Sequence, residues 1–233
     1  MNRKVVAIVP AAGIGRRLGP GTNKAFHILL GRPLIVWAIE VLERTEEIDE
    51  IIPVLKESDM EGGLEVFEQC NFSKVRKVIP GGNQRQDSVY NGLRHIDGKP
   101  NIVLIHDGVR PLVGREKVKE AIYALGGYDG VILGVPVKDT IKQVEDDMVS
   151  NTLRRDTLRA IQTPQVFLHD SLMGAYETAM EKKIYGTDDA ALVERTGGKV
   201  KVIMGSYTNI KITTPEDIPL AEFLLRQKIE HGG

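Results

Sequence analysis

The sequence predicts an α/β fold with a mostly parallel twisted sheet flanked by helices, and its hydrophobic pattern is the reason. Short apolar runs rich in β-branched residues recur along the chain, and stretches with helical spacing separate them. Continuous runs of this kind are typical of strands buried on both faces of a parallel sheet. The alternation of strand, helix and strand indicates βαβ units.

The individual elements follow from this pattern. The predicted strands of the first part of the chain are Val5–Val9, Ile51–Leu55, Val75–Ile79, Ile102–Ile105 and Val131–Val135, with predicted helices at Leu34–Leu42 and Val118–Leu125. Farther along, we expect a helix at Leu172–Met180, strands at Val200–Ile203 and Asn209–Ile212, and a closing helix at Pro215–Lys228 with proline near its start.

Residues 136–160 interrupt the alternation and predict a protruding β-hairpin arm. The segment Thr140–Val144 has period-two patterning, and the polar turn Glu145–Asp147 follows it. An arm whose apolar face has no obvious partner in its own chain often packs against a second copy. We therefore expect a homodimer joined by the arm, with an ordinary surface hairpin as the alternative.

Length and composition restrict the class of protein. The 233 residues fit one large domain over 1–233 with the arm inside it. Because 31 Lys and Arg nearly balance 32 Asp and Glu, the net charge of −1 gives no global attraction to nucleic acid or to an acidic membrane. The chain has one cysteine, Cys70, no apolar stretch long enough for a membrane span, and a first apolar run too short for a signal peptide. We expect a cytoplasmic protein.

The segment Pro10–Lys24 follows the first predicted strand and indicates a phosphate-binding loop. Its glycines allow backbone amides to approach a phosphate, and Arg17 and Lys24 supply positive charge. The spacing G-x-G-x-x-x-G that starts at Gly13 differs from the dinucleotide motif G-x-G-x-x-G, and the chain contains no G-x-x-x-x-G-K-[ST]. A dehydrogenase and a P-loop NTPase are therefore disfavoured. A purely structural strand-to-helix connection is the alternative.

A second loop, Pro80–Ser88, also follows a predicted strand and leads into a helical stretch. Its Gly81 and Gly82 permit close backbone approach, and Ser88 supplies a hydroxyl. In open α/β sheets, ligands bind beyond the carboxyl ends of the strands. We therefore expect this loop to lie beside the first one at a nucleotide or phosphate site.

Asp107 comes directly after a predicted buried strand. There a carboxylate is well placed to bind Mg²⁺ that carries phosphate oxygens, and turn capping is the alternative. His106 is expected to be structural, because no second histidine at ligand spacing supports a zinc site. Lys211 lies in a β-branched run, so its side chain must either reach solvent or meet an anion.

The motifs occur in one order along the chain. They are P-A-A-G-x-G-x-R-x-G…K, G-G-x-x-R-x-D-S, H-D-x-x-R-P, P-V-x-D-T, T-P-Q and N-I-K-x-T-x-P-E-D. This series resembles the 2-C-methyl-D-erythritol 4-phosphate cytidylyltransferases of non-mevalonate isoprenoid synthesis, over Val5 to Leu225. The resemblance implies a Rossmann-like nucleotidyltransferase fold, a homodimer joined by arms, and a Mg²⁺-dependent attack of the sugar-alcohol phosphate on CTP. The products would be 4-diphosphocytidyl-2-C-methyl-D-erythritol and pyrophosphate.

The resemblance also implies roles for individual residues. Arg17 and Lys24 match residues that stabilise charge on the triphosphate, and Arg155 and Lys211 match residues that position the substrate phosphate, so these are the candidate catalytic residues. The candidate nucleotide-binding residues are Pro10, Ala11, Ala12, Gly13, Gly15, Gly81, Gly82, Asn83, Ser88 and Gly108. The candidate substrate-binding residues are Asp107, Arg110, Thr140, Arg155, Thr163, Thr187 and Lys211, and Asp107 is also the candidate metal ligand. Thr140 and Arg155 would reach the neighbouring subunit's site.

The chain departs from the family pattern at two places. The family often has Pro-Lys-Gln where this chain has Asn23-Lys24-Ala25, which predicts a looser loop, and often has Asp in place of Asn83, which leaves the contact to the base open. Two alternative functions remain: a cytidylyltransferase for another sugar-alcohol phosphate, such as ribitol 5-phosphate, and a non-catalytic nucleotide-binding module.

Overall fold

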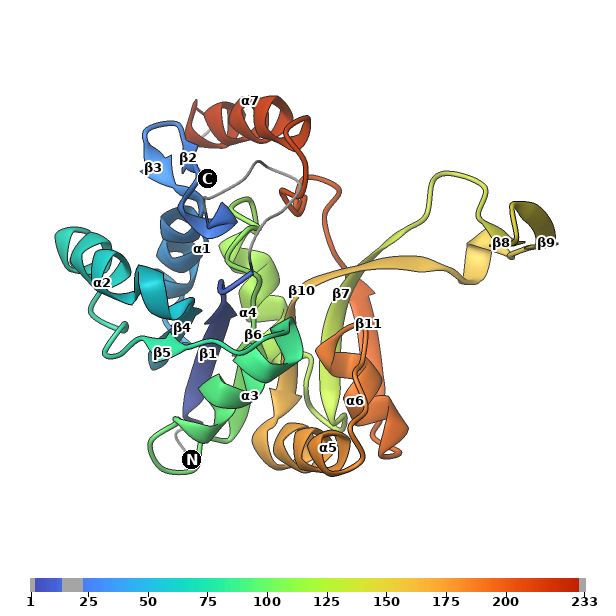
Figure 1. Cartoon of the computed structure of the whole chain (residues 1–233), viewed down its shortest axis with the longest axis horizontal. Helices are drawn as coiled ribbons and strands as arrows, with labels where there is room; N and C mark the ends of the chain where they lie inside the picture. The colour runs from blue at the N-terminus through green and yellow to red at the C-terminus, as the bar shows by residue number, and fades with distance from the viewer. Residues whose placement is uncertain (1–2, 14–22, 231–233) are drawn as a thin grey trace.

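A seven-stranded mixed sheet forms the centre of the computed structural model, which describes residues 3–13 and 23–230 (Figure 1). In order across the sheet, the strands are β11 (Val200–Met204), β7 (Gly130–Pro136), β10 (Arg159–Leu168), β6 (Ile102–Ile105), β1 (Val5–Pro10), β4 (Glu50–Leu55) and β5 (Ile79–Pro80). β10 is antiparallel to β6 and β7, whereas the other neighbouring pairs are parallel. The predicted α/β fold with a mostly parallel sheet is confirmed.

Helices flank this sheet. They are α1 (Leu34–Glu43), α2 (Met60–Gln69), α3 (Arg85–Arg94), α4 (Arg115–Tyr123), α5 (His169–Glu181), α6 (Asp189–Arg195) and α7 (Asp217–Glu230). Short 3-10 helices are η1 (Lys24–Phe26), η2 (Glu57–Asp59) and η3 (Arg155–Thr157), and a two-stranded ribbon pairs β2 (Ile28–Leu29) with β3 (Arg32–Pro33).

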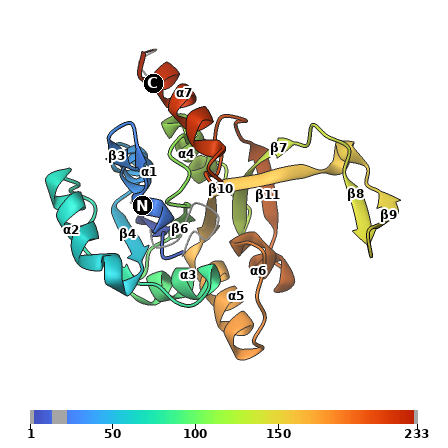
Figure 2. The same cartoon turned by 45° about the horizontal axis from the view of Figure 1, so that its top comes forward.

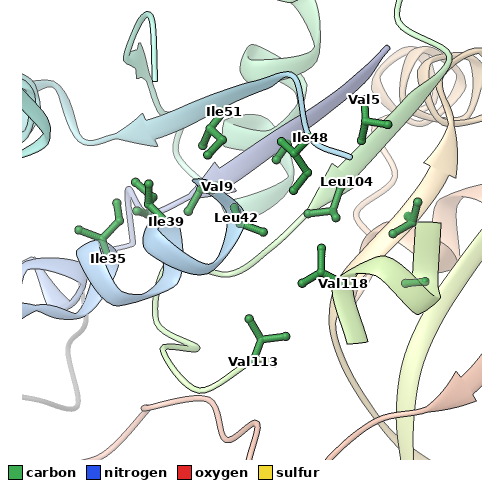
Figure 3. Close-up of a cluster of buried hydrophobic side chains, with 14 of the residues drawn as sticks. Val5, Val9, Ile35, Ile39, Leu42, Ile48, Ile51, Leu104, Val113 and Val118 are labelled. Atoms are coloured by element: carbon green, nitrogen blue, oxygen red, sulfur yellow. The ribbon is translucent and has the colours of Figure 1, made fainter. Parts of the chain in front are cut away.

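The central strands are buried on both faces, because alternate side chains enter two different cores. From β1, Val5 and Val9 join a cluster with α1 and α4, part of which Figure 3 shows. Val6 and Ile8 point to the opposite face and pack with residues of α3, α5 and α6. The continuous apolar run at the start of the chain therefore forms a central strand between two helical layers (Figure 2).

A third, smaller core lies under the closing helix. Ala221 and Leu225 of α7 pack there with Leu29 of β2, Leu112 and Ile212. This cluster attaches the C-terminal segment to the rest of the structure. It thereby fixes the chain that leads from β11 past Lys211 to α7.

Two expectations about individual elements are wrong. In Val75–Ile79, Val75 forms only a bridge to Ile51, and the strand is Ile79–Pro80. The charged residues Arg76 and Lys77 interrupt the apolar run between them, and Lys77 forms ion pairs with Glu50 and Asp97. Asn209–Ile212 is no strand, although the Ile212 amide donates to Val109 O at 3.0 Å.

The second half of the chain also contains elements that the pattern did not reveal. β10 is missed because it contains Pro164 and because its register shifts between Gln162 and Gln165, which breaks the periodicity of an ordinary strand. The short helix α6 is missed as well. Within the described residues, none of the helices is both long enough and apolar enough to cross a membrane.

The predicted arm is present as a hairpin that projects away from the sheet (Figures 1 and 2). It pairs β8 (Lys142–Glu145) with β9 (Met148–Thr152), and Asp146 and Asp147 form the turn with positive φ of 47° and 63°. Val144, Met148 and Val149 are exposed on it by 53%, 72% and 58%. An apolar surface on a projecting hairpin agrees with the expectation of a partner, and the homodimer stays a prediction.

Candidate active site

The carboxyl ends of β1, β4, β5 and β6 open into one cleft of about 910 Å³. Of the predicted residues, it is lined by Pro10, Ala11, Ala12, Gly13, Lys24, Gly81, Gly82, Asn83, Ser88, Asp107 and Lys211. The parallel topology explains this convergence, since segments far apart in sequence leave the sheet at the same edge. Gly15 and Arg17 lie outside the described residues.

The two glycine-containing loops contact each other at Gly81. A Cβ at this position would overlap the Ala12 side chain and lie 2.9 Å from the Ser88 Oγ. The Gly82 amide donates to that Oγ at 3.1 Å, and the hydroxyl in turn donates to the Gln84 carbonyl at 3.1 Å. Ser88 therefore shapes the second loop through its hydroxyl, and glycine is required where this loop meets the first.

The Asp107 carboxylate contacts the cationic side chains of three residues at the floor of the cleft. Its Oδ1 accepts from Arg85 Nε at 3.1 Å, while its Oδ2 accepts from Lys211 Nζ at 2.9 Å and lies 3.4 Å from Arg110 Nε. Burial of the carboxyl raises its pKa, but Arg85, Lys211 and Arg110 outweigh this and hold the pKa well below the ordinary value. Asp107 is therefore ionised, and it fixes the positions of cations that come from separate segments.

Arg85 extends this network behind the cleft. Its Nη1 and Nη2 donate to the fully buried Asp189 carboxylate at 3.0 and 2.7 Å, and the buried Tyr176 hydroxyl donates to the same carboxylate. Burial lowers the pKa of Arg85, but Asp189 and Asp107 outweigh it, so the pKa lies well above the ordinary value. Arg85 thereby ties α3 to α5 and α6.

A hydrogen-bond chain fixes the backbone of Asp107. Burial lowers the pKa of His106 to about 4, so the imidazole is neutral. Because Arg110 O can only accept from His106 Nε2, at 3.1 Å, the proton is on Nε2, and Nδ1 accepts from the Thr163 hydroxyl at 3.0 Å. Thr163 Oγ1 accepts in turn from the Asp107 amide at 3.0 Å. His106 is thus structural, as predicted, and Thr163 lies beneath Asp107.

Two other predicted residues also support the cleft from behind. Arg110 is buried and donates from Nη1 to Asn209 O at 2.8 Å, which ties the C-terminal segment to Asp107. At Gly108, a Cβ would lie 3.1 Å from the Ala11 Cβ, so this glycine allows β6 and β1 to continue into closely packed loops. Neither residue is among those that line the cleft.

Thr140, Arg155 and Thr187 are exposed residues that the structure does not bring to the cleft of their own chain. Arg155 donates from Nη1 to Lys138 O at 2.7 Å within the arm. Thr187 precedes α6. For Thr140 and Arg155 this placement agrees with a role at a partner's site, which stays a prediction.

Several lining residues were not among the candidate catalytic or binding residues. They are Asn23, Ala25, Lys56, Glu57, Ser58, Gln84, Arg85, Val109 and Thr213. Lys56–Ser58 could have been found, because they directly follow the predicted strand Ile51–Leu55 at its carboxyl end. Arg85 belongs to the motif G-G-x-x-R-x-D-S, but its pairing with Asp189 has no such signal, since that partner is 104 residues away.

The described residues do not form a protein cage for a divalent cation. No group of three or more His, Cys, Asp or Glu side chains among them is arranged to hold a metal ion. Both oxygens of Asp107 already face cations of the protein. This donor set fits Mg²⁺ only as part of a metal–nucleotide complex whose phosphates supply most of the ligands. Asp107 remains the candidate ligand from the protein.

Comparison with known proteins agrees with this geometry. The family model described as 2-C-methyl-D-erythritol 4-phosphate cytidylyltransferase matches residues 5–227. The chain belongs to this family. It is 43% identical to the enzyme of that name from Geobacter metallireducens, over 97% of this chain and 99% of the relative, and 45% identical to the one from Caldanaerobacter subterraneus, over 96% and 99%.

Solved structures of the family share the fold. The 4-diphosphocytidyl-2C-methyl-D-erythritol synthase from Anaerococcus prevotii is 34% identical with a TM-score of 0.86, and 97% of each chain is covered. The 2-C-methyl-D-erythritol 4-phosphate cytidylyltransferase from Thermus thermophilus is 29% identical with a TM-score of 0.78, covering 96% of this chain and 99% of the other. The family's nucleotidyltransferase fold is therefore also the fold of this chain.

The Asp107 cluster yields a prediction about stability. Asp107→Asn removes the negative charge but keeps the side-chain shape, so it leaves Arg85, Arg110 and Lys211 without their common counterion. We expect the free energy of unfolding to fall by about 3 kcal/mol or more in urea denaturation. The matched control is Asp97→Asn, which removes an exposed carboxylate that pairs with Lys77 and should change the free energy of unfolding by less than about 1 kcal/mol. Equal effects of the two substitutions would contradict the assigned role of Asp107.

Proposed function

We propose that this protein transfers the cytidylyl group of CTP to 2-C-methyl-D-erythritol 4-phosphate and releases pyrophosphate. The observation that carries the proposal is the cleft at the sheet edge, where two glycine-containing loops face Lys24, Lys211 and the Asp107 cluster. Family membership over residues 5–227 supports the same reaction. The loops offer backbone amides to a triphosphate, and the lysines offer charge.

The reaction joins two anions and therefore needs cations more than a base. An oxygen of the acceptor phosphate attacks the α-phosphorus of CTP, a new P–O bond forms, and the bond from the α-phosphorus to the bridging oxygen breaks as pyrophosphate leaves. Two unit charges 4 Å apart repel by about 4 kcal/mol at an effective dielectric constant of 20. Because the attacking oxygen is already ionised, catalysis rests on positioning and charge stabilisation.

Different residues of this chain serve the triphosphate and the acceptor phosphate. Lys24 and Arg17 stabilise charge that builds up on the triphosphate, and Lys211, held by Asp107, receives the acceptor phosphate. Mg²⁺ neutralises phosphate charge when it is bound with the nucleotide. Thr187 remains a candidate contact to the acceptor. The cytoplasm stays the predicted location.

The arm suggests that the active unit is a homodimer. Thr140 and Arg155 lie on the arm, before and after the hairpin strands and away from the cleft of their own chain, so a positioning role toward the acceptor phosphate requires that they reach a partner's cleft. The exposed apolar side chains of β8 and β9 support such an assembly.

Pyrophosphate release tests the reaction directly. With CTP and Mg²⁺, 2-C-methyl-D-erythritol 4-phosphate and ribitol 5-phosphate are offered in parallel, and we expect release with the erythritol substrate only. Release only with ribitol 5-phosphate would reassign the acceptor and keep the CTP site. Release with neither would favour the nucleotide-binding module.

The two lysines of the cleft should differ in kinetics. We expect Lys24→Ala to lower kcat by about 10²-fold or more with little change in CTP affinity, because its contact strengthens as charge develops in the transition state. Lys211→Ala should mainly raise the KM for the acceptor phosphate. Lys117→Ala, in a surface ion pair on α4, is the matched control and should change neither parameter. Equal loss of CTP binding and kcat in Lys24→Ala, measured by calorimetry and turnover, would argue against its transition-state role.

A mixing experiment tests the shared site. If Arg155 serves the partner's cleft and Lys211 serves its own, a heterodimer of Arg155→Ala and Lys211→Ala protomers contains one intact site. At an acceptor concentration far below the raised KM, where each variant alone is nearly inactive, mixing the two proteins under conditions of subunit exchange should then restore roughly a quarter of the wild-type activity. No recovery, with exchange confirmed by labelled subunits, would show that Arg155 does not act across the dimer. A monomer in light scattering would refute the assembly itself.

A further inference from the structure

Asn23 connects three parts of the cleft wall immediately before Lys24. Its Nδ2 donates to the Ala11 carbonyl at 2.9 Å and to Asp59 Oδ2 at 2.7 Å, and its Oδ1 accepts from the Ala25 amide at 3.0 Å. One amide side chain therefore uses both of its donor hydrogens and its acceptor. The sequence predicts a looser loop at this departure from the family pattern, and the structure instead shows a segment held by three hydrogen bonds.

Both anchors of Asn23 belong to well-fixed parts of the fold. The Ala11 amide donates to Val54 O at 2.8 Å, which continues the pairing of β1 with β4 beyond the end of β1. Asp59 ends η2, where its own amide donates to Lys56 O at 2.8 Å, and α2 begins at the next residue. The Asn23 side chain thus links the residue that follows β1 to the 3-10 helix that follows β4.

The residues after Asn23 place Lys24 against these anchors. Lys24 begins η1, Asn23 caps this helix by accepting a hydrogen bond from the Ala25 amide, and the Ala25 side chain is buried with an exposed fraction of 1%. With Asn23 fixed on one side and Ala25 on the other, the backbone of Lys24 has little freedom. The lysine lines the cleft from this point.

We propose that Asn23 and Asp59 are positioning residues that hold Lys24 at the triphosphate. Neither is assigned a contact with CTP or with the acceptor; both act through the lysine. The inference rests on the proposed cytidylyltransfer, in which a charge must be in place before the transition state forms. A displacement of about 1 Å in such a site can lower the rate by about 10²-fold.

Exchanging the donor and the acceptor tests the contact itself. Asn23→Asp keeps the shape and the acceptor for the Ala25 amide, but it loses both donors and places a carboxylate against that of Asp59. Asp59→Asn keeps an acceptor oxygen for Asn23. In the double variant Asn23→Asp/Asp59→Asn, the new amide at position 59 can donate to the new carboxylate at position 23, so the link between these two side chains re-forms in the opposite direction, whereas the Ala11 carbonyl still lacks its donor.

The expected pattern is specific to positioning. Asn23→Asp should lower kcat by about 10-fold to 100-fold with little change in the KM for the acceptor, and the double variant should recover part of that loss, because only the link between positions 23 and 59 re-forms. Asp59→Asn should stay within about threefold of wild type. Asp59→Ala, which removes the acceptor without adding charge, should lower kcat and provides a second route if Asn23→Asp does not fold; melting temperatures identify that case.

A double-mutant cycle separates positioning from a general structural effect. If Asn23 acts through Lys24, Asn23→Asp should have little further effect on kcat in a Lys24→Ala background, because the positioned group is already gone. Full additivity, wild-type kcat in Asn23→Asp, or failure of the double variant to recover would overturn the proposal. Turnover by wild type in the same assay shows that cytidylyltransfer stands when only the positioning fails. Absence of wild-type turnover would overturn both.

Discussion

The ionised carboxylate of Asp107, held among Arg85, Arg110 and Lys211, is the interaction on which the geometry of the cleft depends. These cations come from α3, from the loop after β6 and from the segment before α7. Burying a charge costs free energy unless the charge is paired and hydrogen-bonded. Each of these three segments is therefore held in place by its ion pair with the same carboxylate. Through Arg85, the network continues to Asp189 of α6 and Tyr176 of α5. It thereby connects two helices of the second half of the chain to the floor of the cleft.

This arrangement also has a consequence for catalysis. A cleft for a triphosphate and a second phosphate needs several cations close together, and these cations repel one another in the free protein. One central carboxylate offsets this repulsion and holds the cations in place before an anionic ligand binds. Preorganised charge of this kind is the main means by which enzymes lower the barrier for phosphoryl and nucleotidyl transfer. The absence of a general base in the proposed mechanism fits a site built mainly from charge and hydrogen bonds.

Sequence reasoning predicted the parallel core of the fold and most of the residues of the cleft. Continuous apolar runs identify strands buried on both faces, and the rule that ligands bind at their carboxyl ends then points to Pro10–Gly13, Gly81–Ser88 and Asp107. β10 was missed because proline and a register shift disrupt its local pattern, and the strand predicted at Asn209–Ile212 is instead a loop that hydrogen-bonds to Arg110 and Thr163. Such features depend on contacts with residues distant in sequence, and the spacing of apolar residues along the chain gives no information about these contacts.

The supporting residues of the site were harder to predict than its lining. Thr163 and Arg110 match family motifs, yet their side chains lie under Asp107, where they fix its backbone and its charge. Asn23 stands where the family often has proline. Its side-chain amide holds the segment through hydrogen bonds, whereas a proline would hold it by restricting the backbone. The sequence alone could not supply the geometry of those bonds.

The structure of the protein with CTP bound tests the central claim most directly, namely that the edge of the sheet at the ends of β1, β4, β5 and β6 is the nucleotide site. We predict that the cytidine lies between Pro10–Gly13 and Gly81–Ser88, with the triphosphate directed toward Lys24 and with Asp107 still paired to Lys211 and Arg85. A nucleotide bound away from these strand ends, or a triphosphate directed away from Lys24, would contradict the account.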